Sequence, residues 1–344
     1  MEPTPPELSV LIPTVLRRED LRRALRSVLD NGFEGTLEIV VSDDDPAGSA
    51  GPVVEEFGDA RIRYVVNPGP PGKAANWSHA AAHARGTFCT KLDDDDLVRP
   101  GYLAKTVEVL RARPEVGSVY TAYEQVNLLT ETRQEVVDRG FFRARPVVAG
   151  PEYARAVLTN EGGYPINHKT TAVYRRELAE RFGHYQHVCE DFAFGVALAV
   201  EGDVAYVPEV LYEYRLHGGN SVADLPGLSR NSFAALQGLE SLETVPAPGR
   251  VTAAEWRGWT ESCRRALPLY FLLAALRTQG SDEAQHLYID LKMEGRLTQP
   301  KLAWGLVNVL GLLPAGLLDG SFRYYQRSRW LRGLGRRLFR GRSG

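Results

Sequence analysis

The chain has 344 residues, of which 44% are hydrophobic and 24% are charged, and its formal net charge is −2. These values are ordinary for a globular protein with one large domain or two modest ones. The near-neutral charge gives no support to a nucleic-acid partner, which normally shows as a basic face or domain.

The three cysteines, Cys89, Cys189 and Cys263, have spacings that match neither a metal site nor a disulfide framework. Residues 1–7 lack the basic segment and the following apolar segment of a signal peptide. We therefore expect reduced thiols and a cytoplasmic location.

Strands and helices alternate along the first hundred residues. Short apolar runs, the first ended by Pro13, predict buried strands at residues 8–12, 37–41, 61–66 and 87–90. Helical spacing of apolar residues, or an alanine-rich composition, predicts helices at residues 19–29, 52–57 and 72–84. This alternation predicts an α/β fold with a mainly parallel, helix-covered sheet. In such sheets ligands bind beyond the carboxyl ends of the strands.

Beyond Pro100 the pattern is less regular. We expect a helix to about residue 113, a strand at 116–123, a polar irregular segment at 124–150, a loop at 162–169, a strand at 170–174, a helix after Asp191, and two short strands at 204–207 and 211–215. Helical patterns follow at residues 228–243, 252–278 and 282–293. The break near Pro226 therefore divides a catalytic domain, residues 1–225, from a helical C-terminal region, residues 226–344.

Four consecutive aspartates, residues 93–96, follow the fourth predicted strand, and a shorter acidic run, residues 43–45, follows the second. Like charges clustered at a strand end repel one another. A divalent cation would relieve this repulsion, and magnesium and manganese prefer oxygen ligands of this kind. An acidic turn on a solvated surface is the alternative, and the run alone does not decide between the two.

An ion held at Asp93 and Asp95 would bridge the phosphates of a nucleotide diphosphate and stabilise the charge of that leaving group. If the diphosphate left an anomeric carbon, the attacking hydroxyl would need a carboxylate base on the opposite face. Glu190 and Asp191, an acidic pair before an amphipathic segment, are candidates for this base. The alternative for Asp191 is a helix N-cap.

Two further residues fit this chemistry. Lys73 is a candidate phosphate partner, although a solvated lysine at a helix start is the more frequent case, and His217 is a candidate metal ligand or diphosphate donor, although a loop histidine often has no role. The motifs His-Glu-x-x-His, Gly-x-Ser-x-Gly and Gly-x-Gly-x-x-Gly do not occur. Most zinc-hydrolase, serine-hydrolase and dinucleotide-binding functions are therefore set aside.

Six stretches together resemble the family-two glycosyltransferases, which have the A-type glycosyltransferase fold. They occur in the family's order and spacing at residues 9–14, 38–44, 67–76, 86–100, 190–191 and 214–217. The resemblance implies an inverting transfer from a UDP- or dTDP-sugar, with manganese or magnesium as cofactor. It also implies that residues 8–100 bind the nucleotide sugar and that residues 101–225 bind the acceptor and carry the base.

For the nucleotide pocket, the resemblance implies a set of residues at the first strand ends and the following helix: Pro13, Thr14, Asp43, Asp44 and Asn76. It places Lys73 near the base or the phosphates. The sequence departs from the family at Val15 and Leu16, where many members have an aromatic residue and an asparagine. A stacking partner for the base therefore has to come from elsewhere, or is missing.

For the reaction centre, the resemblance implies that Asp93 and Asp95 are the Asp-x-Asp pair, with Asp95 as the direct metal ligand and Asp94 as its neighbour at the diphosphate. Asp191 would be the base, supported by Glu190. His217 would complete the metal or diphosphate site. We expect Asp96 to cap the segment that follows it.

In this fold the acceptor pocket is shaped by the chain between the Asp-x-Asp pair and the base. Tyr164, Asn167 and His168 are therefore candidates for contacting an acceptor sugar, or residues that only order their loop. Eight arginines, interleaved with aromatic residues and leucines, follow the apolar residues 302–318. This pattern suits a helix on an anionic membrane surface, and hence a lipid-linked or cell-envelope acceptor, while a core or dimer-forming helix with a basic tail is the alternative.

Two competing functions remain from the sequence. A sugar nucleotidyltransferase normally has a glycine-rich basic loop after the first strand, and residues 13–18 contain no glycine. A scaffold that binds nucleotide sugar without turnover would not need the intact set Asp93, Asp95, Asp191 and His217. Both observations favour the glycosyltransferase, and a homo-oligomer stays open.

Overall fold

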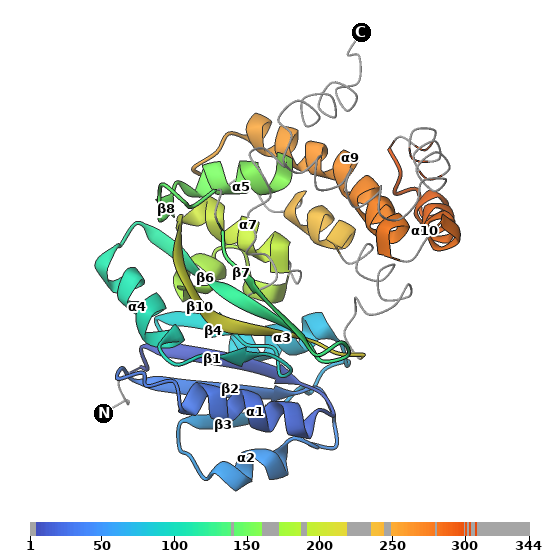
Figure 1. The fold of residues 1–344 in the computed structure, drawn as a ribbon. Coiled ribbons are helices and arrows are strands. Elements are labelled where there is room, and N and C mark those ends of the chain that lie inside the picture. The colour runs from blue at the N-terminus through green and yellow to red at the C-terminus, as the bar shows by residue number, and fades with distance from the viewer. Residues whose placement is uncertain are drawn as a thin grey trace.

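The computed structural model describes residues 5–138, 141–159, 172–186, 191–218, 235–243, 249–278 and 281–298, with positions 300, 303 and 307 (Figure 1). Several predicted features lie outside the described residues. These are the acceptor residues Tyr164, Asn167 and His168, the residue Glu190, the boundary near Pro226, and the basic residues of the C-terminal tail.

Within the described residues, ten strands form one sheet with the order β3-β2-β1-β4-β9-β6-β10-β5, while β7 pairs with β6 and β8 with β10 (Figure 1). Strands that run in one direction are β1 (Leu8–Thr14), β2 (Leu37–Asp43), β3 (Ile62–Val66), β4 (Phe88–Lys91), β6 (Val116–Asn127) and β10 (Asp203–Leu216). The strands that run against them are β5 (Leu97–Val98), β7 (Thr132–Val136), β8 (Val147–Val148) and β9 (Val173–Arg175). The predicted mainly parallel sheet is confirmed.

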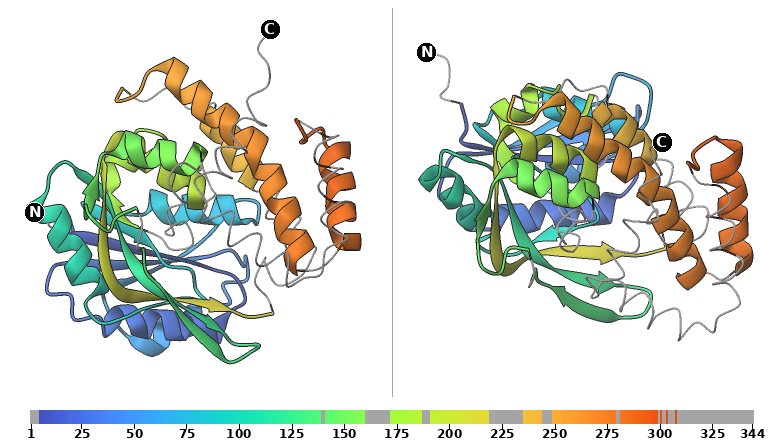
Figure 2. Two further views of the ribbon diagram at one scale, coloured as in Figure 1. Left: turned by 45° about the horizontal axis from the view of Figure 1, so that its top comes forward. Right: turned by 90° about the horizontal axis from the view of Figure 1, so that it is seen from above.

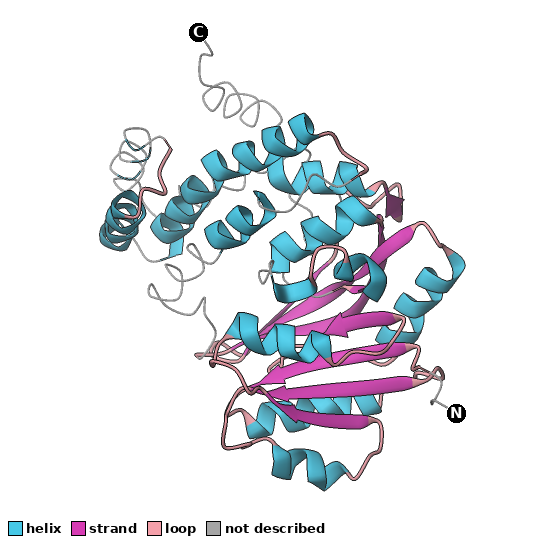
Figure 3. Ribbon diagram, turned by 180° about the vertical axis from the view of Figure 1, so that it is seen from behind, coloured by secondary structure: helices cyan, strands magenta, loops and turns pink. Residues whose placement is uncertain are grey.

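Helices cover both faces of this sheet (Figures 2 and 3). One face packs against α1 (Arg18–Leu29), α2 (Gly51–Phe57) and α4 (Tyr102–Ala112). The other face packs against α3 (Lys73–Ala82), α5 (Gly150–Thr159), α6 (Arg176–Glu180) and α7 (Asp191–Glu201). Successive side chains of a strand point to opposite faces. Val10 and Ile12 of β1 therefore pack under α1, α2 and α4, whereas Leu11 packs under the helices of the other face.

The C-terminal region is helical, as predicted, at residues 235–243, in α9 (Ala253–Thr278) and in α10 (Ser281–Met293). The N-terminal half of α9 packs on α5, and its Trp256 is buried in the same core as α7 (Figure 2). The C-terminal half of α9 forms a separate small core with α10. No helix in the described part of the chain combines the length and the apolar composition needed to cross a bilayer.

Two sequence predictions are wrong. Residues 124–150 are not irregular, because β6 continues to Asn127 and the chain then forms β7 and β8. The side chains of β7 are mostly exposed, so this edge strand carries no apolar alternation that could reveal it. The predicted pair of short strands is one strand, β10, whose pairing with β6 shifts register between Val207 and Tyr212, around Pro208.

A smaller correction concerns Pro13, which does not end β1. The strand continues to Thr14, and Pro13 pairs with Ser42 of β2. The partner on the other side, β4, pairs with β1 only as far as Leu11. A proline lacks the N–H that a second neighbour would need, so it is tolerated at this open position.

The contact between α5 and α7 gives a test of the fold. A Cβ added at Gly150 would overlap the backbone carbonyl oxygens of Ala199 and Gly202, at the end of α7. We therefore expect Gly150→Ala to lower the free energy of unfolding by about 2 kcal/mol, the usual effect of overpacking. Urea denaturation measures this change.

The matched control is Gly258→Ala in α9, where an added Cβ meets no atom. Alanine is the better helix former, so this variant should be unchanged or more stable by about 0.5–1 kcal/mol. Equal stability of the two variants would contradict the described packing.

Candidate active site

The candidate site lies where the central parallel strands end. In register, Thr14 at the end of β1 pairs with Asp43 at the end of β2, and Leu11 of β1 pairs with Lys91 at the end of β4. The aspartate run leaves β4 at this edge. The structure thus brings both acidic runs to one edge of the sheet, where ligands bind in open α/β sheets.

The first acidic run is built into the loops of this edge. Asp43 accepts hydrogen bonds from the backbone N–H groups of Asp45 (3.0 Å) and Ala50 (2.8 Å) and from the Tyr64 hydroxyl (2.8 Å). Asp44 accepts from the Asn67 amide (2.8 Å) and from the N–H of Gly72 (2.7 Å). Both carboxylates therefore fix the loops around the predicted base pocket.

Asn76 of α3 joins the ends of β1 and β2. Its amide donates to the carbonyl oxygens of Thr14 (3.3 Å) and Ser42 (3.0 Å), and it accepts from the Ser42 hydroxyl (2.6 Å). Lys73, at the exposed start of α3, has its ammonium 4.4 Å from the centre of the Trp77 ring. The predicted nucleotide residues thus lie together at one edge.

The second acidic run puts each aspartate in a different environment. The Thr14 hydroxyl donates to Asp94 (2.7 Å), and one guanidinium nitrogen of Arg17 lies 3.1 Å from Asp94 and 2.7 Å from Asp95. Burial raises the pKa of Asp94 to about 7, although the Thr14 hydroxyl and the Arg17 charge lower it. His217, after β10, has its Nε2 3.0 Å from Asp95 Oδ2.

Asp96 does not cap the segment that follows it, as the sequence suggested it would. It is buried, and it accepts hydrogen bonds from the Tyr212 hydroxyl (2.8 Å) and the N–H of Arg215 (2.8 Å). Burial and the neighbouring aspartates raise its pKa. Asp96 therefore attaches the acidic turn to β10, which carries His217 at its end. Sequence could not show this, because β10 lies more than a hundred residues away.

Lys91 is one of the site residues that the sequence did not predict. It is 1% exposed, and its ammonium lies 2.6 Å from Asp93 Oδ1, 3.3 Å from Asp191 Oδ1 and 3.6 Å from the centre of the Trp77 ring. Burial disfavours the charged form, but the charges of Asp191 and Asp93 outweigh it and hold the pKa of Lys91 above its ordinary value. The only sequence signal was a lysine closing a buried strand.

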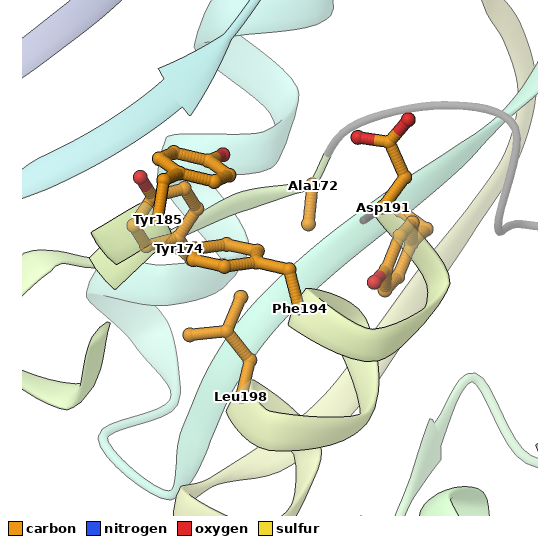
Figure 4. A pocket seen from close by; sticks show the side chains of 7 residues that line it. Ala172, Tyr174, Tyr185, Asp191, Phe194 and Leu198 are labelled. Atoms are coloured by element: carbon orange, nitrogen blue, oxygen red, sulfur yellow. The ribbon is translucent and has the colours of Figure 1, made fainter. Parts of the chain in front are cut away.

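Asp191 is the first residue of α7 and lies at the rim of a small pocket (Figure 4). The other residues that line the pocket are Tyr120, Ala172, Tyr174, Tyr185, Phe194 and Leu198. The Tyr185 ring stacks on Phe194 at 4.2 Å and meets the edge of Trp77 at 5.3 Å. The rings of Phe194, Tyr185 and Trp77 therefore form a row that runs from the Asp191 pocket to the Lys91 ammonium. We call these three rings the aromatic wall.

The predicted metal set is only partly assembled. Asp95 and His217 are in contact, while Asp93 is paired with Lys91. In the described part of the chain, no three His, Cys, Asp or Glu side chains converge as a metal-binding group. Arg17, which the sequence analysis did not single out, lies on the carboxylates of Asp94 and Asp95.

Comparisons with known proteins identify the class. The fold is the A-type glycosyltransferase fold: the TarS protein of S. aureus (residues 1–349) superposes with a TM-score of 0.59 at 14% identity, over 92% of this chain and 91% of that one. Residues 9–183, just over half of the chain, match the model of Glycosyl transferase family 2. The chain belongs to this family and is a glycosyltransferase.

Two further comparisons bear on ligands. The mannosyltransferase PcManGT of Pyrobaculum calidifontis, solved with GDP-Man and Mn²⁺, has a TM-score of 0.52 at 18% identity, over 90% of this chain and 85% of that one. A Campylobacter jejuni GalNAc(5)-diNAcBac-PP-undecaprenol beta-1,3-glucosyltransferase is 36% identical over 106 residues, which are 30% of this chain. The match covers only 34% of that relative's length.

The buried ammonium of Lys91 gives a stability prediction. Lys91→Met would leave Asp93 and Asp191 facing each other without a cation. Removing one partner of a fully buried ion pair costs about 3–5 kcal/mol, and since the two carboxylates are 34% and 32% exposed, we expect a loss of about 2 kcal/mol in unfolding free energy.

The control for this prediction is Lys73→Met, which removes the exposed cation near the same Trp77 ring. It should change stability by less than about 0.5 kcal/mol. Urea unfolding at neutral pH compares the two variants. A Lys91→Met protein as stable as Lys73→Met would contradict the structural role of the buried ammonium.

His184 beside the aromatic wall gives a pH prediction. It is buried, neither ring nitrogen has a hydrogen-bond partner among the described residues, and burial lowers its pKa to about 4. Since the unfolded histidine titrates near 6.5, its contribution to stability is complete above that pH and is lost as the pH falls toward 4.

Replacing His184 with asparagine, which tolerates its left-handed backbone (φ 52°), removes this titration. Between pH 6.5 and 4, the wild-type unfolding free energy should fall more steeply than that of His184→Asn, by up to about 1.4 kcal/mol per pH unit. Parallel pH profiles of the two proteins would show that His184 is not held neutral.

Proposed function

We propose that this glycosyltransferase moves a sugar from a nucleotide diphosphate, UDP or dTDP, to a hydroxyl acceptor with inversion at the anomeric carbon and with a divalent metal ion as cofactor. The observation that supports this most strongly is the arrangement of charged side chains at one edge of the sheet. Asp95 and His217 form one contact, Asp191 lies at the rim of a separate pocket, and Lys91 joins Asp191 to the same acidic run.

Asp95 and His217 suit a metal ion that is held jointly by the protein and by the phosphates of the nucleotide sugar. Manganese and magnesium are commonly held by one or two protein side chains together with phosphate oxygens. The carboxylate oxygen of Asp95 and the imidazole nitrogen of His217 lie 3.0 Å apart and would supply two ligands. When bound, the metal supplies Lewis-acid stabilisation of the diphosphate leaving group.

The protein's own groups would handle the acceptor. Asp191 would accept the proton of the attacking hydroxyl at a carboxylate oxygen. Its Oδ1 faces the Lys91 ammonium at 3.3 Å, which fixes the orientation of the carboxylate. Trp77 and Tyr185, in edge contact beside it, would exclude water from this side.

The relatives support this proposal. TarS has also been solved with UDP, in a structure with a TM-score of 0.56 at 13% identity, and PcManGT with GDP-Man and Mn²⁺. The Campylobacter jejuni relative is named for an undecaprenol-linked substrate. We therefore propose a lipid-linked or cell-envelope glycan as acceptor, reached from the membrane surface.

The role of Asp191 is tested by Asp191→Asn, which keeps the size of the side chain and removes its basicity. General-base catalysis is worth about 10²–10⁴ in rate, so transfer should fall at least about 100-fold. Nucleotide binding should change less than about threefold, since Asp191 is not placed on the nucleotide side. Donor turnover and calorimetric binding measure the two effects over a panel of UDP-, dTDP- and GDP-sugars with Mn²⁺.

The matched control is Glu201→Gln at the other end of α7, where the carboxylate pairs with Arg181 on the surface. Its turnover should equal that of the wild type. Full transfer by Asp191→Asn would remove Asp191 as the base. Absence of donor binding across the whole panel would contradict the proposed function itself.

A further inference from the structure

Arg17 occupies the carboxylates that the proposed function assigns to the metal. One nitrogen, Nη1, lies 2.7 Å from Asp95 Oδ2 and 3.1 Å from Asp94 Oδ1. The same Asp95 Oδ2 atom lies 3.0 Å from His217 Nε2. A guanidinium and an imidazole therefore already share the oxygen that a metal ion would need.

The backbone before Arg17 is shaped to bring it there. Leu16 has a φ of 56°, a left-handed conformation that non-glycine residues rarely adopt, and its side chain is 72% exposed. No burial of Leu16 explains this conformation. The residue that follows this turn, Arg17, contacts the acidic turn, so the left-handed backbone precedes the ion pair directly.

A divalent ion on Asp95 Oδ2 would be repelled by the Arg17 guanidinium that already contacts the same oxygen. A metal–oxygen bond to Asp95 is about 2.1 Å long, and the guanidinium nitrogen is 2.7 Å from that atom, so two like charges would stand within a few ångströms of each other. The Arg17 side chain is 35% exposed and long, so it has room to leave. Its natural alternative partner is a diphosphate, which a guanidinium binds through two oxygens.

We propose that Arg17 is a placeholder cation. In the protein without substrate it neutralises Asp94 and Asp95, and it moves to the nucleotide diphosphate when the metal binds to Asp95 and His217. The inference rests on the proposed function and adds a consequence to it. Metal alone binds weakly because it must displace Arg17 without compensation, whereas metal and nucleotide together bind cooperatively.

The test is a titration of MnCl₂ into the full chain, with free Mn²⁺ followed by electron paramagnetic resonance. It is done without nucleotide and with saturating UDP, dTDP or GDP in turn. We expect Arg17→Gln to bind Mn²⁺ alone at least tenfold more tightly than the wild type. Since the nucleotide then has no displaced Arg17 to receive, the factor by which it tightens Mn²⁺ binding should shrink by a similar amount, and Mn²⁺ should tighten nucleotide binding by that same smaller factor.

Two control variants separate this role from a general loss of positive charge. Arg18→Gln removes the next arginine, which donates to the Ser49 carbonyl and is exposed, and should bind Mn²⁺ as the wild type does. Arg17→Lys keeps a cation on the aspartates and should also keep metal binding weak. Arg17→Lys also replaces Arg17→Gln in the test if the latter does not fold. A lysine cannot bind two diphosphate oxygens as a guanidinium does, so nucleotide should tighten Mn²⁺ binding less in Arg17→Lys than in the wild type.

The outcomes distinguish the two proposals. If Mn²⁺ binds with nucleotide but Arg17→Gln and the wild type bind Mn²⁺ alone equally, the placeholder role is overturned and the proposed function stands. If Arg18→Gln tightens Mn²⁺ binding as much as Arg17→Gln, the effect is net charge and the placeholder role is also overturned. If none of the proteins binds Mn²⁺ with any nucleotide, the metal-dependent function falls, and the placeholder role with it.

Discussion

The site depends on one buried charge, the ammonium of Lys91. A lysine at the end of a central strand, 1% exposed, is tolerated only with partners, and it has the carboxylates of Asp93 and Asp191 and the face of Trp77. These partners come from three separate parts of the chain: the acidic turn, the start of α7 and the middle of α3. By pairing with these groups, the Lys91 ammonium links the acidic turn to the start of α7 and to α3.

The same principle orders the rest of the acidic run. Asp96 is buried against β10, Asp94 accepts from Thr14, and Asp95 faces both Arg17 and His217. Each carboxylate has a different set of partners, with Arg17 shared between Asp94 and Asp95, so the run is not one symmetric acidic cluster. Of the four, only Asp95 contacts both Arg17 and His217. A long arginine side chain can move to a diphosphate, and an imidazole can bind a metal, so these partners suit the proposed exchange of Arg17 for a metal ion.

Sequence reasoning predicted the parallel sheet because its strands are short, apolar and separated by amphipathic or alanine-rich segments. It also placed the two aspartate runs, residues 43–45 and 93–96, at one edge, since parallel neighbours end together, while the family resemblance added Thr14 and Asn76 to the same site. It could not place Arg17, Lys91 or Trp77, because a basic residue after a strand and an aromatic residue in a helix have no motif. Nor could it show that Lys91 pairs with both Asp93 and Asp191, because Asp191 is a hundred residues further along the chain.

We propose that the donor sugar binds between Asp95 and His217 on one side and Asp191 on the other. A crystal structure of the protein with Mn²⁺ and a bound UDP- or dTDP-sugar tests this most directly. We expect the metal on Asp95 and His217, the diphosphate beside it with Arg17 moved onto its oxygens, and the sugar between the metal and Asp191. A nucleotide sugar bound away from the ends of β1 and β4, or a metal that touches neither Asp95 nor His217, would contradict it.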